Sequence, residues 1–275
     1  LGNVAIKANN STPDIINADI LLTGRGNHAS VKGNYFMKRV NGNDFDFNIS
    51  LDTLNMATVE GATMGAISNA SGQVTGKFTL AGTVDKMNID GGLRLQKTGF
   101  NLTMLNSYFL VEDETIAFNN EGIRFDRFEI QDSAKSKATL NGMVYTSDFA
   151  NYRFDLSLRA NNFQAMNSTK QQNRLYWGKL FFSTNMQIKG TATQPVVDGN
   201  LTIGDETNVT VVLPQQEPGV VQREGIVRFV DMDAPENDTL FMQEQARYDS
   251  LNRSVLTGMD INVNLEVKKE AIFSL

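Results

Sequence analysis

The sequence has no cysteine, one histidine and one tryptophan. The absence of cysteine excludes disulfides, thiolate metal sites and cysteine nucleophiles. A single histidine excludes multi-histidine metal sites and leaves at most one imidazole base. No segment approaches the ~20 consecutive apolar residues of a membrane-spanning helix. Basic runs are also missing, and a net charge of −6 with a pI near 4.9 argues against nucleic acid as a partner.

What the sequence does contain is strict alternation of apolar and polar residues. In the segments 45–51, 152–158 and 259–267, every second residue is apolar and its neighbours are polar. Successive side chains of a strand point to opposite faces, so each segment predicts a strand with one apolar face. This pattern gives the following candidate residues for one apolar face: Phe45, Phe47, Ile49, Leu51, Phe78, Leu80, Phe125, Phe154, Leu156, Leu158 and Phe229.

Helix signals are few. Residues 54–68, 163–177 and 243–251 are three short helix candidates, and 214–219 and 231–238 are predicted loops. The fold class is therefore all-β, with few short helices.

Motifs recur along the chain at nearly one offset. Gly82-Thr83 and Asp90-Gly91 match Gly190-Thr191 and Asp198-Gly199 at an offset of 108 residues, and the segment 47–51 matches 154–158 at 107. Ordered matches at one spacing predict a repeat architecture rather than separate globules. We expect one elongated domain over 1–275, with a partial copy at 1–33, repeats at 34–141 and 142–249, and a further strand unit at 250–275.

An apolar sheet face must be covered by a second layer or by a ligand. Short helix candidates cannot cover such a long sheet, since a helical turn rises only ~5.4 Å. The residues alone leave two arrangements open: a sheet closed on itself around a core, or a groove open to an apolar ligand.

Three segments carry a resemblance to a known family. They are 190–203 (with Gly190, Pro195, Gly199, Leu201 and Ile203), 222–231 (with Gly225, Ile226, Val227, Phe229 and Asp231) and 130–142 (with Ile130, Asp132, Ala138, Leu140 and Gly142). In series they resemble the TamB branch of the AsmA-like family, the translocation and assembly module of bacterial envelopes. The sequence departs from the family pattern at Met87, where the better copy has proline, and at Lys135, where the family often has glycine.

The resemblance implies a curved, taco-like sheet with an apolar inner groove. It implies a periplasmic, non-enzymatic protein of a diderm bacterium, with an inner-membrane anchor outside this chain and an outer-membrane barrel of the TamA or BamA type as partner. The implied roles are phospholipid transport between the two membranes and assembly or secretion of outer-membrane proteins. The first residue is Leu1 rather than Met, and we expect an internal fragment of a longer protein.

No catalytic, cofactor or metal site is predicted. His28 is interpreted as a surface position without an evident orienting partner. Glu112 to Glu114 is interpreted as a hairpin turn, and the acidic residues within 231–238 as a solvated loop. The alternative function is a β-helix or sandwich that binds or cleaves polysaccharide, because Asn-rich turns and acidic loops also occur there; its shorter coil repeat argues against it.

Overall fold

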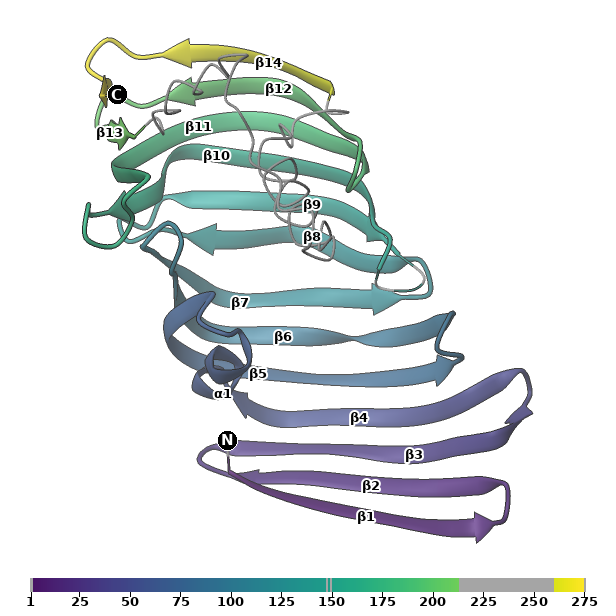
Figure 1. The fold of residues 1–275 in the computed structure, drawn as a ribbon. Coiled ribbons are helices and arrows are strands. Elements are labelled where there is room, and N and C mark those ends of the chain that lie inside the picture. The colour runs from purple at the N-terminus through teal and green to yellow at the C-terminus, as the bar shows by residue number, and fades with distance from the viewer. Residues whose placement is uncertain (1, 147, 149, 213–259, 275) are drawn as a thin grey trace, which may run out of the picture.

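The computed structural model describes residues 2–146, 148, 150–212 and 260–274. These residues form one fifteen-stranded sheet and one helix (Figure 1). The elements are β1 (Asn3–Thr12), β2 (Ile15–Gly24), β3 (Asn27–Val40), β4 (Asn43–Asn55), α1 (Met56–Ala62), β5 (Ile67–Gly82), β6 (Met87–Leu102), β7 (Ser107–Asn119), β8 (Gly122–Gln131), β9 (Lys137–Tyr145), β10 (Arg153–Ser168), β11 (Tyr176–Thr191), β12 (Pro195–Ile203), β13 (Asn208–Val211), β14 (Asp260–Val267) and β15 (Ile272–Ser274).

The strands follow one another as an antiparallel meander from β1 to β12. Two pairings are parallel: β14 adds to β12, and β15 adds to β13. Among the described strands, β1 and β14 each pair with one neighbour only, so the sheet stays open. The predicted fold class, an elongated curved all-β sheet with few helices, is confirmed.

Equivalent motifs occupy equivalent places. Thr83 begins the turn into β6 and Thr191 the turn into β12, and each hydroxyl accepts a backbone N–H three residues later, at 3.1 Å. Gly91 and Gly199 follow with φ angles of 144° and 148°, which L side chains rarely adopt. Met87 and Pro195 both begin a strand, a position where proline is tolerated. The boundaries of the repeat units stay a prediction.

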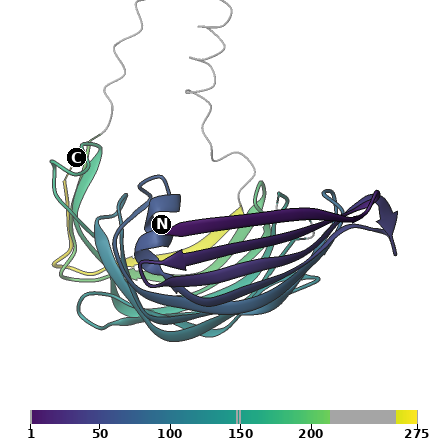
Figure 2. The same ribbon diagram turned by 90° about the horizontal axis from the view of Figure 1, so that it is seen from below.

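A line of irregularities bends the sheet. Asn69, Lys97, Arg127 and Asn162 have φ angles of 45–53°, in the left-handed region, within β5, β6, β8 and β10. At each, pairing with a neighbouring strand skips or shifts, as at a β-bulge. Bulges bend the strand that carries them. Viewed along the direction in which the strands stack, the sheet is a U-shaped trough (Figure 2).

Of the two helix predictions that fall on described residues, one contains a helix and the other is wrong. Within 54–68, α1 covers Met56–Ala62, and the Asn55 side chain caps it by accepting the N–H of Ala57 at 2.9 Å. The helix predicted at 163–177 is wrong: β10 continues to Ser168 and β11 begins at Tyr176. Bulges beside Phe163 and before Met166 lengthen the spacing between successive apolar residues from two positions to three, which resembles the period of a helix.

The hairpin turn predicted at Glu112 to Glu114 is also wrong, because these residues lie inside β7, level with the left-handed Lys97 of β6. An exposed bend in a strand accepts the same polar residues as a turn. The candidate helix 243–251, the loops 214–219 and 231–238, and Phe229 lie outside the described residues.

Candidate functional site

The predicted apolar-face residues that the structure describes lie on one face. In the register of β4 and β5, Phe47 opposes Leu80 and Ile49 opposes Phe78. Directly opposed residues of antiparallel strands share a face. Following the register from strand to strand brings Phe125, Phe154, Leu156 and Leu158 onto the same face as the β4 residues.

One row of directly paired residues crosses thirteen strands without a polar side chain. It consists of Val4, Leu22, Ala29, Leu51, Gly76, Leu93, Ile116, Phe125, Gly142, Leu156, Ile188, Val197 and Ile261. We call the face that carries this row the apolar face. At ~4.8 Å between strands the row is roughly 58 Å long. The adjacent row, on the other face, includes Ser50, Lys77, Arg124, Asp155 and Lys189.

The helix identifies the apolar face as the concave one. Asn27 lies on this face because it is two residues from Ala29 on β3, and residues two apart on a strand point to the same face. The Asn27 amide donates to the Thr58 hydroxyl of α1 at 2.9 Å and accepts the N–H of Asn55 at 2.9 Å. Figure 2 shows α1 inside the hollow of the U. The trough is therefore lined by apolar side chains.

One aromatic pair meets across an intervening strand of the apolar face. The rings of Phe78 and Phe118 flank Gly91 in the register and meet over it, edge to face, with centroids 5.5 Å apart. Their strands are two spacings apart, ~9.6 Å in a flat sheet. Glycine between two large residues leaves room for this approach, and a side chain at that position would collide with β5.

Midway along the trough, β7 and β10 come together across the intervening strands, at a contact between Phe109 and Phe163 that we call the pinch. Phe109 of β7 stacks on Phe163 of β10 with centroids 5.6 Å apart, although β8 and β9 lie between these strands. The Ser107 hydroxyl donates to the carbonyl of Gln164 at 3.3 Å. Ala138 and the partly buried Ile130, Leu158 and Phe182 pack around the two rings. A cluster of buried hydrophobic residues thus lies at this contact, whereas most residues of the apolar row are partly buried or exposed.

On the apolar face, large side chains are exposed at both ends of the sheet, on β1 and on β14. Ile6 on β1 is 69% exposed and Ile261 on β14 is 56% exposed, although both belong to the apolar face. Other than α1, no described element lies over this face. The arrangement suits a ligand that needs a continuous apolar surface and few hydrogen bonds.

Asp132 is a structural residue that sequence reasoning did not single out, although it belongs to the quoted 130–142 motif. Its carboxylate is 3% exposed and accepts three backbone N–H groups: Ala134 and Ser136 at 2.8 Å and Gln164 at 2.7 Å. It thereby shapes the β8–β9 turn and ties it to β10 at the pinch. Lys135 in this turn has a φ of 67°, which explains why glycine suits this position.

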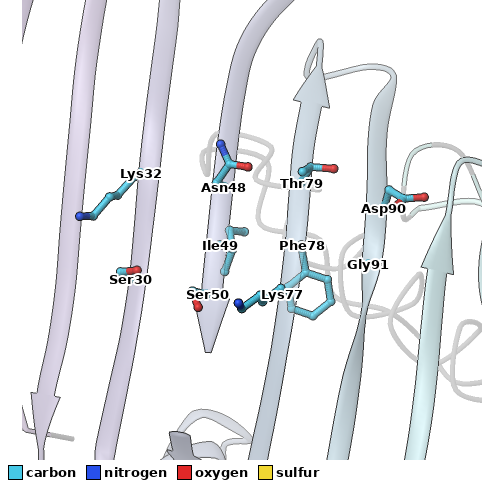
Figure 3. A pocket seen from close by; sticks show the side chains of 10 residues that line it. All are labelled: Ser30, Lys32, Asn48, Ile49, Ser50, Lys77, Phe78, Thr79, Asp90 and Gly91. Atoms are coloured by element: carbon cyan, nitrogen blue, oxygen red, sulfur yellow. The ribbon is translucent and has the colours of Figure 1, made fainter. Parts of the chain in front are cut away.

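The face opposite the apolar one carries a shallow hollow (Figure 3). By register, most of its lining belongs to the polar face of β3–β6, including Lys32, Asn48, Lys77 and Asp90. These groups carry both charges, and Ile49 and Phe78 of the apolar face also line the hollow.

His28, at one end of the polar face, does have a partner that the sequence did not reveal. Its Nδ1 lies 2.8 Å from an oxygen of Asp52, and the Ser50 hydroxyl donates to the other oxygen at 2.8 Å. The Ser50 and then the His28 hydrogen bond lower the pKa of the Asp52 carboxyl. The carboxylate, and not the imidazole, faces the serine hydroxyl, which differs from the order in a serine-hydrolase triad.

Within the described ranges no group of three or more His, Asp or Glu side chains could hold a metal ion. No helix in this part of the chain is long and apolar enough to cross a membrane. A family model described as the TamB C-terminal domain matches residues 126–274. Searches of curated proteins and of solved structures found no match.

Proposed function

Because the chain belongs to the TamB family, a family of the cell envelope, we propose that it is a non-enzymatic periplasmic segment whose trough carries phospholipid acyl chains between the inner and outer membranes. The observation that carries this proposal is the unbroken apolar row across thirteen strands. A row of roughly 58 Å is about twice the ~30 Å hydrocarbon thickness of a bilayer. The trough can therefore hold several acyl chains in succession.

The openness of the trough favours transport of lipid over its storage. A closed core would seal the apolar side chains from cargo, whereas most residues of the apolar row are partly buried or exposed. Acyl chains need no specific hydrogen bonds, and the row offers none. In this proposal an outer-membrane barrel of the TamA or BamA type receives the cargo, and an inner-membrane anchor outside this chain holds the protein in place.

The exposed strand edges favour a second role, in assembly of outer-membrane proteins. Among the described strands, β1 and β14 each leave one side of the backbone unpaired, and such an edge can accept a strand of a client protein. Lipid carriage would use the apolar face, and client binding would use the edges. The two roles therefore respond to different substitutions.

Two adjacent substitutions test lipid carriage. Leu156 lies in the apolar row, and Ser157 lies on the opposite face of the same strand, paired with Asn141 and Gln187. We expect protein purified without added lipid to retain phospholipid, measured by mass spectrometry of an organic extract. Leu156→Asp should lose most of it because a charge interrupts the row, and Ser157→Asp should keep it. Equal retention by both variants, or a lipid-free parent protein, would refute the proposal.

A further inference from the structure

The β10–β11 hairpin ends in an exposed loop, residues 169–175, at one end of the sheet (Figure 1). Leu175 at its base is 59% exposed, and its carbonyl accepts the N–H of Val212 at 2.7 Å. The only tryptophan of the chain, Trp177, follows within β11 together with Tyr176. The exposed Leu175 is thus followed along the chain by two partly buried aromatic residues, whose side chains point to opposite faces of β11.

The charged residues of this region are all basic. Residues 156–197 contain five basic residues and no acidic one, in a chain with 31 acidic and 25 basic residues. Three of the five, Lys170, Arg174 and Lys179, belong to the loop and the start of β11. The Lys170 ammonium lies 5.2 Å from the centre of the Trp177 ring, within cation–π distance.

Neighbouring strands extend the apolar part of this end. Trp177 and Gly178 pair with β13, which pairs in turn with β15, where Ile272 is 53% and Phe273 is 51% exposed. The segments 204–212 and 268–274 contribute three acidic residues, and one of them, Asp205, lies 3.7 Å from the Lys268 ammonium. The hairpin end is therefore apolar, aromatic and cationic together.

We propose that this hairpin end, residues 169–179, docks on a bilayer surface that contains anionic phospholipid. Tryptophan and tyrosine favour the level of the headgroups, where one side of the ring is apolar and the other is wet. Lysine and arginine are attracted by anionic headgroups and keep their charge in water while their stems lie in apolar surroundings. An acidic protein surface would satisfy the cations but would leave the 59% exposure of Leu175 unexplained.

Trp177 serves as a native probe of this contact. The protein is mixed with vesicles of phosphatidylcholine alone or with phosphatidylglycerol added, and both sedimentation and tryptophan emission are recorded. We expect binding and a blue shift of the emission only with the anionic vesicles, and a loss of both at high salt. At about fivefold in affinity per cation, Lys170→Gln/Arg174→Gln should weaken binding by about 25-fold.

The matched control is Lys7→Gln/Lys77→Gln, which removes the same charge from exposed positions on β1 and β5. The proposal is overturned if the two double variants bind alike, if anionic vesicles do not bind, or if binding leaves the emission of Trp177 unchanged. Leu156→Asp separates this proposal from the transport proposal, because it empties the trough and should leave vesicle docking intact.

Discussion

Asp132 offers a test of how the pinch is held together. Replacing it with alanine removes the acceptor of three backbone N–H groups, of which the Gln164 N–H is fully buried. The N–H groups of Ala134 and Ser136 are only partly buried and can turn to water. Hydrogen bonds to a buried charge contribute about 1.5–3 kcal/mol each, and partly exposed ones less. We expect Asp132→Ala to lower the free energy of unfolding by about 3–4 kcal/mol.

Asp132→Asn separates hydrogen bonding from charge. The amide oxygen can still accept the two turn N–H groups, but the amide nitrogen then faces the Gln164 N–H, donor against donor. The loss of this one bond should cost about 2 kcal/mol. An isolated buried carboxylate would instead be relieved by neutralisation. The sign of the Asn effect therefore decides whether the three N–H groups outweigh the desolvation of the charge.

Urea denaturation followed by circular dichroism measures both variants. The control is Asp126→Asn, the same chemical change at a side chain that is 84% exposed in β8, where we expect less than about 0.5 kcal/mol. The reasoning is refuted if Asp132→Asn is as stable as the control or more stable than the parent.

Two further predictions concern the bend and one loop. Arg127→Gly should raise the free energy of unfolding by about 0.5 kcal/mol, because glycine adopts a left-handed φ without strain. Arg124→Gly, on the same strand but outside the left-handed positions, should lower the free energy of unfolding by about 1 kcal/mol. The reverse order of the two variants in urea denaturation would contradict this account of the bend. Hydrogen bonds from the backbone N–H groups of Asn151 and Ala150 lower the pKa of the Asp148 carboxyl from 3.8 to about 2. Its contribution to stability should therefore be complete above pH 4 and be lost as the pH falls towards 2, and an NMR titration of Asp148 with a midpoint near 3.8 would disprove it.

The sequence determined the strand faces because alternation is a local property. Once residues 45–51 and 154–158 form strands, the covalent geometry places Phe47 and Leu156 on the apolar side of each. The match between Gly82-Thr83 and Gly190-Thr191 was readable for the same reason, since each motif forms a turn between residues within a few positions of one another. The strand content, the few helices and the family motifs all follow from such short-range patterns.

The long-range features came only with the tertiary structure. Whether the apolar face closes or stays open depends on the curvature summed over many strands, and this curvature is set by bulges at residues such as Lys97 and Arg127, whose side chains give no hint of a left-handed backbone. Bulges also led to the wrong helix prediction at residues 163–168, because they interrupt the alternation of apolar and polar residues that identifies a strand.

Contacts between distant residues were equally hidden. Asp132 meets the Gln164 N–H across 32 positions, and Phe109 meets Phe163 only because the sheet curls across two intervening strands. Local sequence thus determined which face of each strand is apolar. The tertiary structure decided that the faces join into one open trough, because strand register and bending bring together residues that no short-range pattern links.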